Sequence, residues 1–535
     1  MLPKSFLIIL LSACTSVQAQ LSADTVAMID KLMNRYADSI PGAQLAISRN
    51  GQVIYTAARG LADLEHNVPL TKTSKIEAGS VSKQFTAAAI LLLQQQGKLS
   101  TEDDVRKYIP ELPDYGKTIR IRHLMQHTSG LKDWGSIAEL SGWPRTTKAY
   151  NNDDALAIII RQKTLNNDPG DEYIYSNSGY TLLTHIVQRV SGMSHADFTK
   201  QYLLEPAGMK HTEWRNNFSR VVKDRAIAYE KNGDDYYMNM PFEDTYGHGA
   251  LLTTAEDLLA WNEFYLGARL GADLLKTQLQ TNSLNNGKPN LYAAGLNVIK
   301  VNGWRTISHS GATAGYRANL EYFPDLGLSV AWLSNNANGV SGVPGAIREL
   351  FVKDTVKRTT VTEKASPVDI KTFAPYLGAY RNEKMGGGFR VWMTDTSLMS
   401  TPNGRMIPVS DRIATMGRAR IIFQAKPRSL QYITPSGDTL VFTGADTAST
   451  TATALKEYEG TYESEETDAA VQLFEKNGKL YSRVRNSETE LTPVYKDGFS
   501  IPAGDVFFER NKQGRITRLL VSISRARKVE YKKVK

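Results

Sequence analysis

The sequence predicts an α+β domain followed by two small antiparallel β-barrels. In the first part, about residues 24–352, segments with strand-like composition stand before and after a central block with helical spacing of apolar residues. Strands separated by such a block are typical of helices packed on an antiparallel sheet. From residue 371 onward, short strand-like segments alternate with turn residues, which is typical of a sandwich or small barrel.

The elements of the first domain follow from local patterns. Asn50-Gly51 separates two apolar segments, at 42–48 and 52–57, and this dipeptide favours a hairpin turn. Apolar residues at helical spacing predict helices at about 81–96, 153–162, 178–191 and 254–266. Further strands are expected at about 292–301, 305–310, 317–323 and 327–334.

Two C-terminal segments resemble each other. Tyr376-Leu-Gly-Ala-Tyr380 corresponds to Tyr458-Glu-Gly-Thr-Tyr462, and each opens roughly 80 residues of short predicted strands. A polar segment rich in Thr and Lys precedes the first of them and suits a linker. We therefore place the domains at 24–352, 371–447 and 454–535, with the linker at 353–370.

The N-terminus has the features of a secretion signal, predicted as a signal peptide at 1–19. Lys4 precedes an apolar segment, and Val17-Gln-Ala19 offers a small-residue cleavage site. The sole cysteine, Cys14, lies in Leu11-Ser-Ala-Cys14, which resembles a lipoprotein box. Two outcomes stay open, a lipid anchor at Cys14 or cleavage after Ala19. Either predicts a periplasmic or extracellular protein, and no later apolar run approaches the ~18 residues of a transmembrane segment.

Composition argues against several functions. The formal net charge is +9, but the basic residues are dispersed rather than clustered, so nucleic acid binding is not expected. No P-loop or dinucleotide fingerprint occurs, so no cofactor is expected. His123 and His127 have the spacing of metal ligands on a helix, but no third ligand accompanies them, so no metal is expected.

Ser80 lies at the start of the apolar helical segment at 81–96, and Lys83 follows on the same helical face. Taken alone, the pair is most simply an N-cap with a solvated charge. Two other motifs change that interpretation. Tyr175-Ser-Asn177 comes directly before another amphipathic helix, and His309-Ser-Gly311 ends a predicted strand.

In this order, Ser-x-x-Lys, Tyr-x-Asn and His-x-Gly resemble the signature of the serine beta-lactamase and penicillin-binding protein superfamily. Further segments resemble family sequences at 124–131, 249–258 and 324–333. The resemblance covers about 24–350 and is closest to the class C-like branch, with its beta-lactamases, esterases, DD-peptidases and D-aminopeptidase. The D-aminopeptidase also has two β-barrels behind its catalytic domain. That architecture implies barrels that wall the active site; the alternative is that they stabilise the protein or bind cell wall.

The resemblance implies an acyl-enzyme mechanism with Ser80 as the nucleophile. Lys83 and Tyr175 are the two candidates for the base, and their unperturbed pKa values are about 10.4 and about 10, so each needs a shifted pKa. Our hypothesis is that Tyr175 accepts the Ser80 proton and passes it to the leaving group. The pair is expected to titrate as a unit.

The remaining motif residues are expected to bind substrate. Asn177 would orient the substrate amide or the lysine, and Gly311 would leave room beside its strand. Backbone N–H groups of Ser80 and Ala312 would form the oxyanion hole. His309 stands where many beta-lactamases have a lysine, and histidine is mostly neutral above pH ~6.5. This weakens the case for a beta-lactamase that binds a substrate carboxylate. The substrates that remain are esters, amides or peptides with a free D-amino terminus.

The sequence thus predicts an exported serine hydrolase that acts on an ester, an amide or a D-amino-acid-containing peptide. The alternatives within enzymes are a DD-peptidase (a penicillin-binding protein) and a class C-like beta-lactamase. The alternative outside enzymes is a muropeptide-binding protein. Arg305 and Arg317 lie near the third motif and could supply charge there; the simpler expectation is that both are surface residues.

Overall fold

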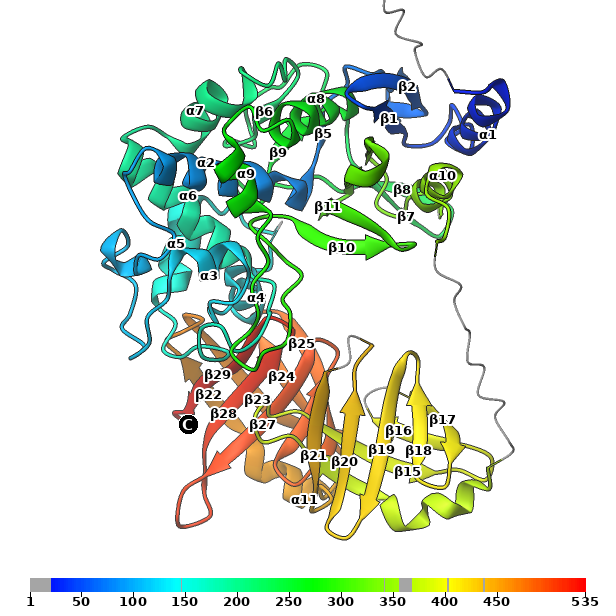
Figure 1. Cartoon of the computed structure of the whole chain (residues 1–535). Coiled ribbons are helices and arrows are strands. Elements are labelled where there is room, and N and C mark those ends of the chain that lie inside the picture. Colours follow the sequence, from blue (N-terminus) through cyan, green and yellow to red (C-terminus); the bar gives the residue numbers. More distant parts are fainter. Residues whose placement is uncertain (1–20, 146, 341, 356–367, 402–403, 436–437) are drawn as a thin grey trace, which may run out of the picture.

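The computed structural model describes residues 21–145, 147–340, 342–355, 368–401, 404–435 and 438–535. The predicted signal peptide with Cys14, and most of the predicted linker at 353–370, lie outside the described residues. A catalytic-domain candidate at the N-terminal side is followed by two barrels (Figure 1). Among the helices that the structure describes, none is long and apolar enough to cross a membrane.

The first domain is built on a six-stranded antiparallel sheet in the order β10-β11-β12-β13-β1-β2. Its strands are β1 (Ala43–Arg49), β2 (Gln52–Arg59), β10 (Asn297–Val301), β11 (Trp304–Thr313), β12 (Tyr316–Phe323) and β13 (Leu328–Ser334). Pairing of β1 with β13 joins the two ends of the domain. The predicted hairpin is confirmed, because Asn50 and Gly51 both have positive φ (50° and 76°) in its turn.

Helices cover both faces of this sheet. One face packs on α1 (Ala23–Met33) and α10 (Val343–Phe351), and the other on a larger apolar core that includes the remaining helices. These are α2 (Lys83–Gln95), α3 (Ile121–Met125), α4 (Trp134–Leu140), α5 (Asn152–Ile160), α6 (Asn177–Ser191), α7 (His195–Thr199), α8 (Ala255–Leu266) and α9 (Ala272–Gln278). Short strands complete the domain: β3 (Leu61–Asp63), β4 (Val68–Pro69), β5 (Ile76–Glu77), β6 (Glu213–Trp214), β7 (Tyr229–Asn232), β8 (Asp235–Met238) and β9 (Leu251–Thr253).

The four predicted helices are confirmed as α2, α5, α6 and α8. One predicted strand is partly wrong, since the segment expected at 292–301 becomes a strand only at Asn297. The reason is Gly295, which has φ 77° and lies against helix α2; a Cβ there would stand 2.8 Å from the Cα of Gln84. The chain therefore turns before β10 instead of extending it.

The predicted C-terminal barrels are confirmed as two closed, eight-stranded antiparallel barrels. The first consists of β14 (Gly378–Arg381), β15 (Gly388–Met393), β16 (Leu398–Thr401), β17 (Gly404–Ser410), β18 (Ile413–Met416), β19 (Ala419–Ala425), β20 (Arg428–Ile433) and β21 (Thr439–Ala445). The second, after α11 (Ala452–Leu455), consists of β22 (Gly460–Ser464), β23 (Ala469–Lys476), β24 (Lys479–Val484), β25 (Ser487–Tyr495), β26 (Gly498–Ile501), β27 (Gly504–Arg510), β28 (Ile516–Ile523) and β29 (Ala526–Lys533).

The repeated Tyr-x-Gly-x-Tyr segments occupy equivalent places in the two barrels. In each, the hydroxyl of the second tyrosine donates to the backbone carbonyl of the first, as Tyr380 does to Tyr376 and Tyr462 to Tyr458. The motif thus closes the turn that leads into the first strand of each barrel.

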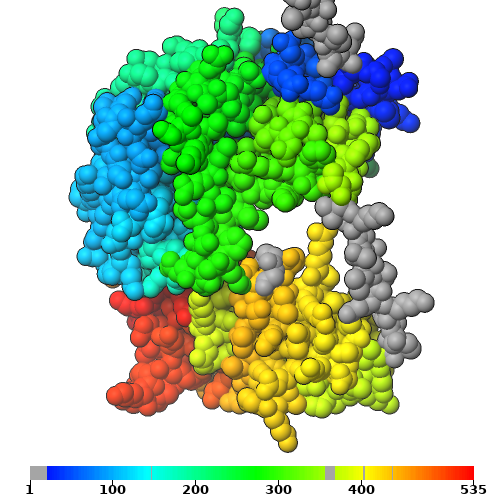
Figure 2. Space-filling view, viewed as in Figure 1, coloured from blue at the N-terminus to red at the C-terminus, as the bar shows by residue number. Residues whose placement is uncertain are grey.

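The second barrel packs directly against the first domain, and the first barrel lies beside the second (Figure 1, Figure 2). Apolar residues of the second barrel belong to the same continuous core as helices α2, α4 and α6, whereas those of the first barrel form a separate cluster. The position of the second barrel is therefore set by packing as well as by the chain connection.

Candidate active site

Ser80 and Lys83 lie together at the start of helix α2. Ser80 belongs to a single 3₁₀ turn, Gly79–Ser82, that leads into the helix. The Lys83 side chain is fully buried, and its Nζ hydrogen-bonds to Ser80 Oγ at 3.1 Å. The simple interpretation of this pair as an N-cap with a solvated charge is therefore wrong; the residue at the N-cap of α2 is Ser82, without a side-chain hydrogen bond to the helix.

The environment of Lys83 favours its neutral amine. Burial lowers the pKa of Lys83 well below its usual range, and the positive charge of Arg145 lowers it further, while Asp133 opposes the shift. Nζ also donates to Asn177 Oδ1 at 2.9 Å and to the carbonyl of His248, and both contacts hold it beside Ser80. A neutral amine at hydrogen-bond distance from a serine hydroxyl can accept its proton.

Tyr175 lies in the loop before α6, close to the same serine. Burial raises the pKa of Tyr175; Ser80 opposes the shift, although the two hydroxyls are not hydrogen-bonded to each other in this structure. Tyr175 is therefore a neutral phenol, and the directions of the two pKa values weigh against our hypothesis that it removes the Ser80 proton. Lys83 fits that role better.

His127 shapes the loop that presents Tyr175. Its ring centroid is 4.1 Å from that of Tyr175, and its Nδ1 accepts a hydrogen bond from the N–H of Ser176 at 3.2 Å. Its carbonyl accepts the N–H of Ile174 at 2.9 Å, and its own φ is 56°. His127 thus fixes the backbone of Ile174 and Ser176, the residues on either side of Tyr175.

Asn177 is the first residue of α6. Its backbone N–H donates to Asp133 Oδ2 at 2.6 Å, and its side-chain oxygen accepts from Lys83. Of the two roles expected for Asn177, the structure shows the orientation of Lys83 directly. Because the amide also lines the cavity described below, contact with a substrate is compatible with this arrangement.

Strand β11 passes close to the Ser80 turn, and two glycines permit the approach. A Cβ at Gly311 would lie 1.9 Å from the carbonyl oxygen of Ala78, and a Cβ at Gly79 would lie 2.7 Å from the backbone nitrogen of Ala312. Only glycine fits at either position. The expected oxyanion donors, the N–H groups of Ser80 and Ala312, therefore lie on two segments in close contact.

His309 lies in β11 and is almost fully buried, although it lines the cavity described below. Its Nδ1–H donates to the carbonyl of Ser310 at 2.6 Å, which leaves Nε2 to accept the hydroxyl of Tyr292 at 2.9 Å. Burial lowers the pKa of His309 to about 3, and the nearby Lys83 lowers it further. His309 is therefore neutral and supplies no positive charge. No sequence motif marks its partner Tyr292.

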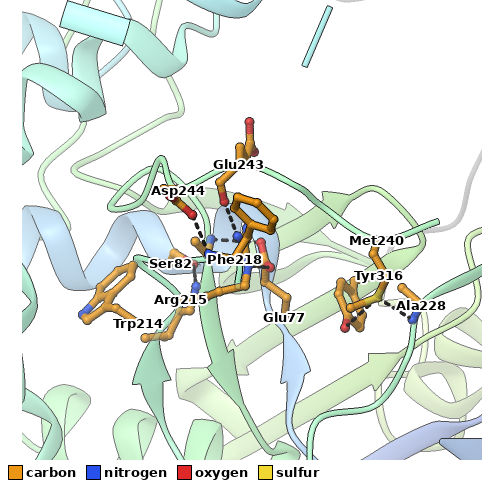
Figure 3. A network of polar contacts seen from close by, with 12 residues as sticks. Glu77, Ser82, Trp214, Arg215, Phe218, Ala228, Met240, Glu243, Asp244 and Tyr316 are labelled. Carbon is orange, nitrogen blue, oxygen red and sulfur yellow. Dashed lines mark hydrogen bonds and ion pairs between the residues drawn. The ribbon is translucent and has the colours of Figure 1, made fainter. Parts of the chain in front are cut away.

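A buried ion-pair network holds the segment that precedes Ser80, and Figure 3 shows its members Glu77, Arg215 and Glu243. Glu77, three residues before Ser80, accepts Arg215 Nε at 2.9 Å and the N–H of Ala250 at 3.1 Å. Arg215 also donates to the carbonyl of Glu243, whose carboxylate pairs with Arg145. Glu77 and Arg215 are each 1% exposed, so this pair fixes the segment before Ser80 against β9.

The motif residues open into one cavity of about 740 Å³. The sequence-predicted residues that line it are Ser80, Tyr175, Asn177, His309, Gly311 and Ala312. Three arginines also line it: Arg145, Arg317 and Arg525. Arg317 is partly buried and borders this cavity, which fits the expectation that it could supply charge near the third motif; its guanidinium donates to two backbone carbonyls. Arg305 is exposed as expected.

Arg525 comes from the turn between β28 and β29 of the second barrel. Its guanidinium carbon lies 4.9 Å from the centre of the Tyr175 ring. Sequence reasoning missed this residue, because it follows all three motifs and nothing in a barrel hairpin marks it as part of a distant site. The expectation that a barrel walls the active site therefore fits the second barrel.

Comparison with known proteins places these features in a family. The model of the beta-lactamase family matches residues 27–352, which include all three motifs. The chain belongs to the beta-lactamase family. It is thus a serine hydrolase of the beta-lactamase and penicillin-binding protein superfamily, and its catalytic domain is the part that the family model covers.

Relatives and a solved structure agree with this assignment. Penicillin-binding protein 4* of Bacillus subtilis is 28% identical over 356 residues, 62% of this chain and 78% of its own length. A D-aminopeptidase of Brucella anthropi is 24% identical over 522 residues, 92% of this chain and 95% of its own. The octameric penicillin-binding protein homologue from Pyrococcus abyssi shares the fold across 95% of this chain and 99% of its own, at a TM-score of 0.54 and 19% identity.

Proposed function

We propose that this enzyme is an exported serine hydrolase that cleaves an ester, an amide or a D-amino-acid-containing peptide through an acyl-enzyme. The observation that carries the proposal is the 3.1 Å hydrogen bond between Ser80 Oγ and Lys83 Nζ. The Lys83 side chain is buried there, and burial lowers its pKa. The similarity to a D-aminopeptidase over almost the whole chain supports the substrate class. The signal-like N-terminal sequence supports export.

In the proposed reaction, Lys83 Nζ takes the proton of Ser80 as Oγ attacks the carbonyl carbon of the substrate. The carbonyl oxygen becomes an oxyanion, and the N–H groups of Ser80 and Ala312 stabilise it. The Lys83 ammonium then returns the proton to the leaving nitrogen or oxygen, and Tyr175 is placed to relay it as a neutral phenol. In the second half of the reaction the same amine takes a proton from a water molecule as the water oxygen attacks the acyl carbon, and the ammonium returns that proton to Ser80 Oγ as the bond between Oγ and the acyl carbon breaks.

A first experiment compares three chromogenic substrates: D-alanine p-nitroanilide, L-alanine p-nitroanilide and p-nitrophenyl acetate. We expect hydrolysis that falls by about 10⁴–10⁶-fold in Ser80→Ala. A D-over-L preference that disappears in this variant would establish a D-amino-acid-directed peptidase. Ester cleavage alone, lost in the variant, would establish the nucleophile in an esterase. Hydrolysis that survives in Ser80→Ala would contradict the proposal.

Reaction with a penicillin distinguishes the two alternative enzymes, a DD-peptidase and a beta-lactamase. Rapid turnover would favour a beta-lactamase, and a stable penicilloyl adduct on Ser80 would favour a DD-peptidase. A binding protein for muropeptides would bind its ligand without either reaction. The Ser80–Lys83 hydrogen bond favours the enzymes over the binding protein, because binding alone does not require a buried, neutral amine at a serine hydroxyl.

A further inference from the structure

The charges that line the catalytic cavity have one sign. Among the described residues that border it, three are arginines and none is an aspartate or glutamate. Two of the arginines have their own acceptors, since Arg145 pairs with the Glu243 carboxylate and Arg317 donates to the carbonyls of Ala314 and Tyr316. Arg525 differs from both.

The guanidinium of Arg525 has no carboxylate partner among the residues that the structure describes. Two acidic residues that contact this turn, Asp133 and Glu172, have other partners. Asp133 accepts the backbone N–H of Asn177 at 2.6 Å, and Glu172 pairs with Arg527 at 3.0 Å and with Lys384 at 2.6 Å. The Arg525 side chain instead stacks over the ring of the Tyr175 phenol, inside the cavity.

The backbone of Arg525 is held firmly by the catalytic domain. Its carbonyl accepts the N–H of Asp133 at 3.0 Å and the side-chain amide of Asn166 at 3.0 Å. The same asparagine accepts the N–H of Arg527 at 2.7 Å, so it binds both sides of the turn. The next residue, Ala526, is fully buried. The catalytic domain therefore fixes the backbone of this turn on both sides of the Arg525 side chain, whose guanidinium remains available to bind a ligand in the cavity.

We propose that Arg525 binds a carboxylate of the substrate, so that the second barrel selects anionic substrates for the serine of the first domain. This inference rests on the proposed function for its choice of peptides and amides as ligands. A guanidinium offers paired N–H donors that match the two oxygens of a carboxylate. The interaction between the two groups is stronger where the cavity excludes part of the water. His309, being neutral, cannot bind the carboxylate as a cation. The same cations repel a substrate with a free amino group beside the scissile bond.

A carboxylate site at Arg525 would distinguish this enzyme from its D-aminopeptidase relative in one respect. An aminopeptidase must accept a free amine next to the bond it cleaves, whereas this cavity holds Arg525 and two further arginines with no acidic residue among its described lining. A substrate whose carboxylate lies near the scissile bond, such as a peptide that ends in a D-residue, fits these charges better.

The test uses binding, so that it does not depend on turnover. In a Ser80→Ala background, calorimetry measures the affinity of N-acetyl-D-alanyl-D-alanine and of its C-terminal amide. These two ligands differ in one charge. We expect the carboxylate to bind about tenfold or more tightly, as for a hydrogen bond between charged groups. Adding Arg525→Gln should equalise the two affinities, while adding Arg525→Lys should keep part of the preference.

The matched control is Arg518→Gln, which removes an exposed arginine of β28 that is not part of the cavity lining. It should leave the carboxylate preference unchanged. Equal thermal unfolding midpoints of the Arg525→Gln and Arg518→Gln variants show that the barrel stays docked.

Three outcomes would overturn the inference: a preference for the amide or none at all, no measurable binding of the carboxylate, or a preference that survives Arg525→Gln. Failure of the proposed function has a different signature. It would appear as the absence of Ser80-dependent hydrolysis, with the binding preference unaffected.

Discussion

The two barrels have the same eight-stranded closed topology and begin with the same tyrosine motif, but they relate to the catalytic domain differently. The second barrel shares an apolar core with the catalytic domain and buries an ion pair against it, between Glu466 and Lys132. The first barrel has a separate core, and its ion pairs to the catalytic domain are exposed, such as Lys384 with Glu172 and Lys288 with Asp438.

The difference shows that a repeated fold does not imply a repeated role. Among the described residues of the two barrels, the one that lines the catalytic cavity is Arg525, in a hairpin turn of the second barrel. The buried Glu466 and the hydrogen bonds that hold the Arg525 turn have the same effect, because both fix the position of the second barrel relative to Ser80. The first barrel meets the second at a small apolar cluster of Ala379, Val494 and Tyr495. The first barrel is thus placed to support the second.

The largest expected effect comes from breaking the buried ion pair. Glu466 accepts Lys132 Nζ at 3.0 Å and 2.8 Å and the N–H of Lys163 at 2.9 Å, and both members of the pair are almost fully buried. In Glu466→Gln the buried ammonium loses its counter-charge, so the free energy of unfolding should fall by about 3–5 kcal/mol. Urea denaturation measures this change at the first unfolding transition.

The matched control is Glu490→Gln, which breaks an exposed ion pair with Lys479 in the same barrel. It should change the free energy of unfolding by about 0–1 kcal/mol. If Glu466→Gln is no more destabilising than this control, the second barrel is not anchored by the buried pair and the contrast between the barrels is lost.

A smaller effect is expected on the pH dependence of catalysis. Lys83 must be neutral to act as the base, so kcat/KM should rise with pH through the pKa of Lys83. Arg525 is one of the cations that lower this pKa, after burial and Arg145. Arg525→Gln should therefore raise the pKa and move the acidic limb of the profile to higher pH.

Profiles of kcat/KM against pH, recorded with a neutral ester, measure this shift. Arg518→Gln again serves as the control, because that arginine is exposed and outside the cavity. A limb that stays in place or moves to lower pH in Arg525→Gln would show that the second barrel does not influence the base.

The smallest effect is expected at the contact of the first barrel. Lys384 pairs with Glu172 at 2.6 Å, but the lysine is largely exposed and Glu172 keeps its second partner, Arg527, when Lys384 is removed. Lys384→Gln should change the free energy of unfolding by about 0–1 kcal/mol and leave hydrolysis unchanged. A loss comparable to that of Glu466→Gln would mean that both barrels are anchored alike.

The sequence predicted those parts of the site that local patterns encode. Ser80 and Lys83 lie one helical turn apart, and Tyr175 and Asn177 stand together where a loop enters α6, so their spacing was informative on its own. Folding then gave these residues properties that spacing does not contain: the burial that lowers the pKa of Lys83 arises from packing of many distant segments.

The missed residues depend on contacts between remote parts of the chain. Arg525 enters the cavity because Asn166 and Asp133 hold its turn, and no pattern in a barrel hairpin predicts that docking. The neutral state of His309 likewise depends on its burial, and the hydrogen bond from Tyr292 comes from a residue outside the motif. The strand predicted from residue 292 failed for the same reason, since Gly295 turns the chain against helix α2.

The most direct test of the account is the rate at which a fluorophosphonate modifies Ser80, followed by intact-protein mass spectrometry and peptide mapping. We expect a single adduct on the peptide that contains Ser80, none in Ser80→Ala, and a rate about 10²–10⁴-fold lower in Lys83→Ala. Tyr175→Phe should slow the reaction less than Lys83→Ala does. An adduct elsewhere, or a larger loss in Tyr175→Phe than in Lys83→Ala, would contradict the assignment of Lys83 as the base for Ser80.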